Sequence, residues 1–168
     1  GFMARALVNN LSVTFDNSIR KAGVSESFFG KGKSDHTPVN RFWLSMISPQ
    51  NIASQIAVVY LKDGNDGYTK EDSFSSGGSD ALYSIVDDQK ITINGKSAFT
   101  NTDVVSLGST HFSTGNYTIV LDDQEGVFDQ DQNIYLKDKQ TGMVTNLRKG
   151  SYTFFANAGA STGRFEIV

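Results

Sequence analysis

Apolar and polar residues alternate in most of the longer runs of this chain, and this alternation constrains the fold more than any other feature. In residues 40–48, NRFWLSMIS, the side chains of Phe42, Leu44 and Met46 share one face, because successive residues of a strand point to opposite sides. Residues 55–61, QIAVVYL, are apolar on both faces, which predicts a central strand covered on both sides. No stretch of twelve residues keeps the 3.6-residue period of a helix.

Similar runs follow at regular spacing, each bounded by Gly, Asn, Asp or Ser turns. Residues 138–142, DKQTG, are typical of a hairpin tip, and Gly150 is expected to supply a positive φ at a turn. Residues 79–86, SDALYSIV, are interpreted as one or two helical turns. The predicted strands are residues 2–7, 12–18, 40–48, 55–61, 90–95, 103–108, 116–123, 133–138, 142–147, 150–157 and 164–168.

These ten to eleven strands predict an all-β fold with little helix, organised as an antiparallel two-sheet β-sandwich or jelly roll. The length of 168 residues suits a single domain that spans the whole chain, 1–168.

The composition excludes several classes of site and partner. The absence of cysteine removes disulfides, thiolate catalysis and cysteine-ligated metal sites. A net charge of −3 without a basic stripe argues against nucleic acid or an anionic membrane as partner. The longest apolar run, residues 56–61, is far shorter than the roughly 20 residues of a membrane span.

One acidic segment has the beginning of a calcium loop. Asp129, Asp131 and Asn133 alternate as the first three ligands of such a loop do. However, Ile134 stands where the loop needs glycine, and Gln140 stands where it needs the closing carboxylate. The pattern therefore favours an acidic turn before a strand, with calcium as the less favoured interpretation.

The longest loop holds a second group of oxygen ligands and two aromatic residues. Asp63, Asn65 and Asp66 are interleaved with glycine, which favours a tight turn over a calcium site. Tyr68 and Phe74 in the same loop are candidate ligand-binding residues, since an exposed aromatic ring can pack on a sugar or anchor a partner.

No catalytic set is predicted. His36 and His111 stand in polar, loop-like stretches without a second histidine at metal-ligand spacing, and are interpreted as lone surface histidines. Asp122, Asp123 and Glu125 crowd one predicted turn at the end of a strand, rather than facing each other across a cleft as glycoside hydrolysis requires. The sequence therefore favours a protein that is not an enzyme and needs no cofactor.

Several segments, taken in order, resemble a family of bacterial modules. The segments are GFMARA at residues 1–6, NRFWLSM at 40–46, NDGY at 65–68, AFTNTDVVSLG at 98–108 and, most clearly, IYLKDKQTGMVTNLRKGSYTFFANAGASTGRFEIV at 134–168. Together they resemble the β-rich module that precedes the C-terminal sorting domain in cargo and surface proteins of the Bacteroidetes (Flavobacterium-type) type IX secretion system. The chain departs from that pattern at Ser106, where the family favours proline.

The resemblance implies a non-catalytic module of a secreted or outer-cell-surface protein, which acts in adhesion, in presentation or as a stalk next to a secretion signal. It also implies that the chain is a fragment of a larger secreted protein, which contacts the type IX machinery through a sorting domain beyond this chain. The alternative is a carbohydrate-binding module, with calcium as a structural ion. A surface glycan or a protein would then be the partner.

Overall fold

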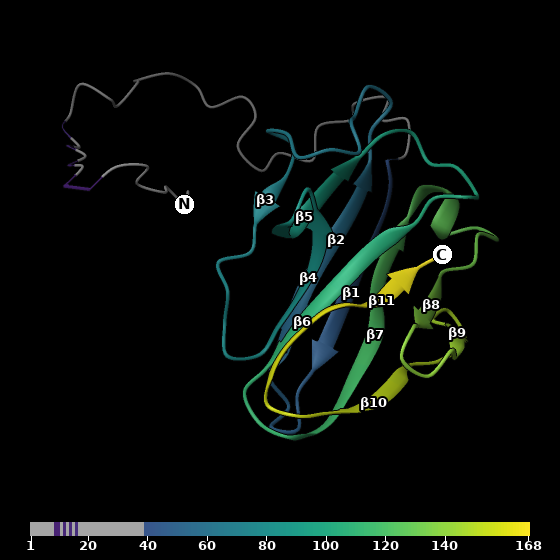
Figure 1. The fold of residues 1–168 in the computed structure, drawn as a ribbon. Helices are drawn as coiled ribbons and strands as arrows, with labels where there is room; N and C mark the ends of the chain where they lie inside the picture. Colours follow the sequence, from purple (N-terminus) through teal and green to yellow (C-terminus); the bar gives the residue numbers. More distant parts are fainter. Residues whose placement is uncertain (1–8, 11, 13, 15, 17–38) are drawn as a thin grey trace. The chain divides into compact units, whose positions relative to one another are not determined.

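The computed structural model describes residues 9, 10, 12, 14, 16 and 39–168. Residues 39–168 belong to one compact unit of the chain, His36–Val168. Its regular structure consists of eleven strands and the short 3₁₀ helix η2 (Gly126–Phe128), within the described range (Figure 1). The strands are β1 (Asn40–Ile47), β2 (Ala53–Tyr60), β3 (Ser73–Phe74), β4 (Ala81–Val86), β5 (Gln89–Lys96), β6 (Val105–His111), β7 (Gly115–Glu125), β8 (Tyr135–Asp138), β9 (Val144–Asn146), β10 (Tyr152–Ala156) and β11 (Gly159–Ile167).

The prediction of an all-β chain with about ten to eleven strands is confirmed for the described residues. Strands predicted over residues 2–7 and 12–18 lie outside the continuous described range. The hairpin predicted at residues 138–142 joins β8 to β9, and Gly142 has a φ of 74° there. Gly150 does not have the positive φ that was expected of it.

Hydrogen bonds join the strands into one connected sheet with the order β10-β7-β1-β2-β5-β4-β6-β11-β8-β9, and β3 pairs with β5. Strand β5 pairs antiparallel with β4 through its first residues and parallel with β2 through its last, so it links the two halves of the path. The path ends at β10 and β9, which are consecutive in sequence and joined by residues 147–151. The sheet is therefore curled and nearly closed, with β10 lying next to the β8–β9 region (Figure 1).

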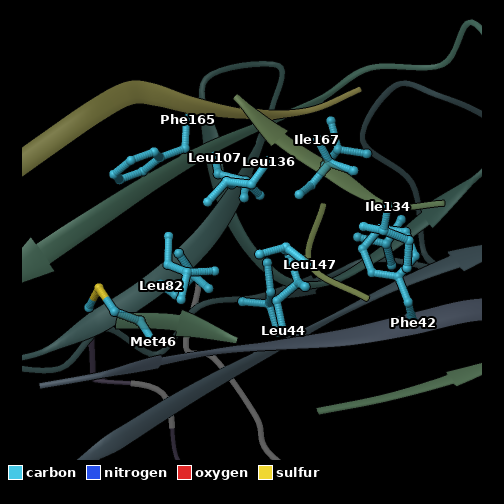
Figure 2. Close-up of a cluster of buried hydrophobic side chains, with 14 of the residues drawn as sticks. Phe42, Leu44, Met46, Leu82, Leu107, Ile134, Leu136, Leu147, Phe165 and Ile167 are labelled. Atoms are coloured by element: carbon cyan, nitrogen blue, oxygen red, sulfur yellow. The ribbon is translucent and has the colours of Figure 1, made fainter. Parts of the chain in front are cut away.

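The core fills the inside of this curled sheet. Phe42, Leu44 and Met46 of β1 are buried, as their alternation predicts. In Figure 2, Leu44 and Leu136 of β8 extend into the same space from opposite sides. Full burial of one such side chain contributes about 1.5–3 kcal/mol, so packing between distant strands supplies the main stabilisation.

The helical turns predicted over residues 79–86 are wrong, because this segment is strand β4, between β5 and β6. Leu82 lies in the core, while Tyr83 on the other face is equally buried, so the segment shows no alternation. The ring of Tyr83 lies across Gly108 of β6, where a Cβ atom would come within 2.4 Å of it. A short apolar run covered on both faces cannot be distinguished from a helix by periodicity.

Candidate functional site

Three polar side chains meet where the two ends of the curled sheet approach each other. Asp138 ends β8, Tyr152 begins β10 and Arg164 belongs to β11, and we call these three residues the closing cluster. Tyr152 shares the inward face of β10 with Phe154, whereas Arg164 lies in a register shift of β11. That irregularity turns a side chain away from the position that strict alternation would give it.

The geometry of the closing cluster is that of a buried, bidentate ion pair. Nη2 of Arg164 lies 2.7 Å from Oδ2 of Asp138, and Nε lies 3.1 Å from Oδ1. The hydroxyl of Tyr152 donates to Oδ2 at 2.9 Å. Nη1 of Arg164 donates to the backbone carbonyl of Phe155 at 3.2 Å, which ties β11 to β10 as well. The cluster thus connects β8, β10 and β11 without a backbone ladder between β10 and either of the other strands.

The surroundings set the charges of these groups. Burial acts to raise the pKa of Asp138, but hydrogen bonds from Arg164, from Tyr152 and from the amide of Gln140 outweigh it and lower that pKa overall. Burial raises the pKa of the Tyr152 hydroxyl, with the neighbouring Asp138 adding to the effect, so the phenol stays a donor. The guanidinium of Arg164 packs over the ring of Phe154 at 4.8 Å. The cluster is built to hold a fixed pair of charges.

A second polar group, which we call the loop cluster, consists of Tyr60, Asp66, Lys96 and Asp103. Nζ of Lys96 lies 3.2 Å from Asp103 and 3.3 Å from Asp66. The hydroxyl of Tyr60 donates to Asp103 at 2.8 Å, and burial together with that carboxylate raises the pKa of Tyr60. This cluster attaches the longest loop and the segment after β5 to the end of β2.

Asp66, a metal ligand only in the less favoured interpretation of its loop, is therefore engaged by protein groups. Its Oδ1 accepts from the amide of Ser97 at 3.1 Å and lies near Lys96. Slight burial acts to raise the pKa of Asp66, but the hydrogen bonds from Ser97 and the charge of Lys96 lower it overall. The side-chain oxygen of Asn65 accepts from the amide of Gly67 at 2.8 Å, as in a tight turn, and Asp63 is exposed.

Similarity to a known protein family extends over the whole chain. A family model for a domain of unknown function, DUF8693, matches residues 1–168. The chain belongs to the DUF8693 family. No curated protein and no solved structure matches the DUF8693 chain significantly. Among the residues described for it, no helix has the length and hydropathy needed to cross a membrane.

The other candidate metal ligands of the DUF8693 chain, which the sequence did not favour as a metal site, lie in a turn before β8. Asp129 directly follows η2 and is exposed, as is Asp131. The side-chain oxygen of Asn133 accepts a hydrogen bond from the side-chain Nδ2 of Asn146 on β9 at 2.8 Å. Nowhere in the described part of the chain do three or more His, Asp or Glu side chains gather as they would around a metal ion. An acidic turn before a strand, the favoured interpretation, describes this segment.

The two aromatic candidates of the DUF8693 chain are brought together. The rings of Tyr68 and Phe74 lie 4.8 Å apart, and Tyr68 is partly exposed. The amide of Tyr68 donates to Asp87 at 2.8 Å, which holds the loop against the β4–β5 turn. The pair is thus an ordered aromatic surface rather than two separate side chains.

Two interpretations of polar residues need correction. Asp122 and Asp123 lie in β7, within the strand predicted over residues 116–123, but β7 continues to Glu125 where a turn was expected. Glu125 accepts two hydrogen bonds from Arg41, each of 2.9 Å. His111 is not a surface residue, because it ends β6 on the inward face and is 3% exposed. His36 lies outside the described residues.

Sequence reasoning missed the closing cluster, although one signal was present. Ile134, Leu136 and Asp138 occupy alternate positions, so the strand pattern places a carboxylate on the core face of β8. A buried carboxylate needs a cationic or hydrogen-bonding partner. No comparable signal marks Arg164, since its orientation depends on the register shift in β11.

Proposed function

We propose that the DUF8693 domain is a non-catalytic module of a secreted or cell-surface bacterial protein, acting in adhesion, in presentation or as a stalk next to a type IX secretion signal. The observation that carries this proposal is the closing cluster. It joins β10, at one end of the sheet, to β8 and β11 near the other end in a chain without cysteine, which gives a nearly closed β domain suited to the outside of a cell. The proposal assigns the module no cofactor.

The resemblance supports the cellular context. Residues 134–168 carry its clearest part, and all three residues of the closing cluster lie there. In the bacterial modules that the segment resembles, a sorting domain follows and is read by the type IX machinery. We infer the same arrangement for the parent protein of this domain.

We also infer that the curled sheet acts as two facing halves of a sandwich. Strands β10, β7, β1 and β2 form one half, and β4, β6, β11, β8 and β9 form the other, with β5 pairing to both. Core side chains from both halves support this division, since Phe42 and Leu44 pack in one cluster with Leu107 and Phe165. Such a rigid, two-layered body is suited to hold a neighbouring domain away from the cell surface.

Surface labelling of intact cells tests the proposal. An antibody raised against the purified domain should label cells of the source bacterium, and labelling should disappear in a strain that lacks the type IX outer-membrane channel. Permeabilised cells of both strains serve as the control for expression. Labelling that requires permeabilisation in both strains contradicts an extracellular role.

Replacement of the module by another domain tests whether it acts as a stalk or as an adhesin. The domain is replaced in its parent protein by an unrelated β domain of similar length, and attachment of the cells to surfaces is measured. Unchanged attachment supports a stalk, and lost attachment with normal export supports adhesion. Loss of an enzymatic activity located in this domain contradicts the non-catalytic assignment.

Carbohydrate binding is the second candidate function. It is favoured by aromatic side chains that remain exposed in separate, described parts of the chain, namely Tyr68, Phe112 and Phe155. Exposed rings of this kind provide the apolar face on which a sugar ring packs. A calcium-dependent form of this function is tested by running the binding measurement with and without a chelator.

A further inference from the structure

A surface cavity lies where β1 begins and where β2 and β5 end. It has a volume of about 390 Å³, which falls in the usual range for small-molecule sites. Strand pairing brings these ends together, since Tyr60 of β2 lies opposite Asn40 of β1 and also opposite Lys96 of β5. The lining residues that matter for its chemistry are Val39, Asn40, Tyr60, Leu61, Lys62 and Phe99.

The walls of the cavity are mainly apolar. Val39 and Leu61 are only half-buried, so part of their surface remains open to a ligand. Phe99 is also partly buried, and its ring lies 5.1 Å from that of Tyr60 and 4.9 Å from that of Phe128. These two buried rings hold Phe99 in place. A ligand with an apolar body would therefore cover apolar surface that is already formed.

The polar side chains of the wall have a donor to spare. Oδ1 of Asn40 already accepts a hydrogen bond from the amide of Val127 at 3.0 Å. Nδ2 of Asn40 has no partner in the described part of the chain and, unlike the fully buried Nε2 of His111, it retains solvent-accessible surface. The hydroxyl of Tyr60 is engaged, because it donates to Asp103. A ligand that uses this wall must therefore bring an acceptor.

Lys62 supplies the charge of the cavity. Its side chain is exposed, and no described residue forms an ion pair or a hydrogen bond with its ammonium. The ammonium of Lys96 is instead balanced by Asp66 and Asp103. Asp63, the next residue after Lys62, is exposed and does not line the cavity. Because none of the lining residues is acidic, an anionic ligand is favoured over a cationic one.

We propose that this cavity binds the carboxylate of an acid that has an apolar body. The apolar part packs on Leu61 and Phe99. The carboxylate accepts hydrogen bonds from Nζ of Lys62 and Nδ2 of Asn40. Such a group belongs both to small organic acids and to a peptide chain that ends in an apolar residue. The inference goes beyond the proposed stalk or adhesion role, and it depends neither on export nor on sugar binding.

Titration of the complete 168-residue chain with model acids tests this site. Phenylacetate is added up to about 50 mM at constant ionic strength, while backbone amide signals are followed by NMR. The amides of Leu61, Lys62 and Phe99 should shift in a saturable way. Phenylacetamide lacks the charge and acetate lacks the ring, so each should bind about tenfold more weakly or less.

A dipeptide distinguishes the two sources of the carboxylate. N-acetylglycylphenylalanine is titrated in the same way, beside its C-terminal amide. Binding of the dipeptide acid about tenfold tighter than phenylacetate identifies the end of a peptide chain as the ligand. Equal or weaker binding of the dipeptide acid identifies small organic acids. Either result supports the site, and in both the dipeptide amide should bind more weakly than the dipeptide acid.

Two variants and a matched control assign the contacts. Lys62→Gln should weaken the binding of phenylacetate by about fivefold or more. Lys149→Gln changes an exposed lysine outside the cavity and should leave binding within about twofold. Asn40→Asp keeps the acceptor for the amide of Val127 but replaces the donor by a carboxylate. It should weaken binding by about tenfold or more with unchanged circular dichroism.

Four results would overturn the proposal: no saturable shift with either acid, equal binding of the acids and their amides, equal shifts with acetate, or equal effects of the two Lys→Gln variants. The surface labelling described above does not depend on this cavity. Absence of acid binding with normal labelling therefore rejects the cavity site and leaves the extracellular assignment intact. Absence of labelling with normal acid binding does the reverse.

Discussion

The closing cluster and the loop cluster are built from the same chemical groups and differ in what they hold. In the closing cluster, Asp138 binds the cation of Arg164 and the hydroxyl of Tyr152. In the loop cluster, Asp103 binds Lys96 and the hydroxyl of Tyr60 in the same way. Each cluster is an aspartate between a cation and a phenol.

Their environments are different. The side chain of Asp138 is 0% exposed, and that of Asp103 is 18% exposed. The planar guanidinium of Arg164 meets its carboxylate through two nitrogens, whereas the ammonium of Lys96 is a point charge shared between two carboxylates. The closing cluster joins opposite ends of the sheet, so we expect the fold to depend on it far more than on the loop cluster.

Removal of Asp138, the central carboxylate of the closing cluster, should have the largest effect on the free energy of unfolding. Asp138→Ala leaves the buried guanidinium of Arg164 without its partner and should reduce the free energy of unfolding by about 3–5 kcal/mol. Urea denaturation followed by circular dichroism measures this change. The control is Glu166→Ala, which removes the more exposed ion pair with Lys139 and should cost about 1 kcal/mol or less. Equal losses in the two variants would contradict the comparison.

The equivalent change in the loop cluster should be smaller. Asp103→Ala removes the partner of the Tyr60 hydroxyl, but Lys96 keeps its contact with Asp66, which lies closer to solvent. We expect a loss of about 1–2 kcal/mol in the same urea experiment. A loss as large as that of Asp138→Ala would contradict the idea that the closing cluster contributes more to stability because it joins distant strands of the sheet.

The pH dependence of stability sharpens the comparison. Because the pKa of Asp138 is lower in the folded chain than in the unfolded chain, its contribution is complete above about pH 4 and is lost as pH falls through the folded pKa. Asp138→Asn should therefore flatten the acid side of the stability curve. Asp66→Asn, also at a carboxyl with a lowered pKa but largely exposed, should change that slope less. Urea midpoints at a series of pH values from about 2 to 6 measure both slopes.

Salt should have the smallest effect. Between about 0.05 and 0.5 M sodium chloride, the difference in unfolding free energy between the wild type and Asp66→Ala should shrink, because exposed charges are screened. The difference between the wild type and Asp138→Ala should stay constant, because the buried pair is shielded from ions. Thermal denaturation at several salt concentrations detects this contrast.

Much of the fold could be predicted from the sequence because alternation is a local signal. Strands such as β1 and β7 follow directly from inward-facing residues like Leu44 and Ile119. Strand β4 could not be recognised, because burial of both Leu82 and Tyr83 removes the alternation. Alternation also fixes the faces of a strand but not the order of strands, so the single curled sheet was beyond sequence reasoning.

The candidate site was harder to predict from the sequence than the fold. Its groups come together from segments far apart in the chain, as Asp66, Lys96 and Asp103 do in the loop cluster. Acidic residues near glycines favour a turn but are compatible with a metal site, and only the contacts of Asp66 with Ser97 show how that residue is used. His111 was misjudged because its neighbours are polar, although its position in β6 points inward.

Hydrogen exchange of backbone amides tests the central claim, that the closing cluster holds the two ends of the sheet together. Exchange is compared between the wild type and Asp138→Asn under native conditions. The account predicts faster exchange in β8, β9 and β10 together, while the amides of β1 and β2 keep their protection. Uniform acceleration across all strands, or unchanged protection in β10, would contradict it.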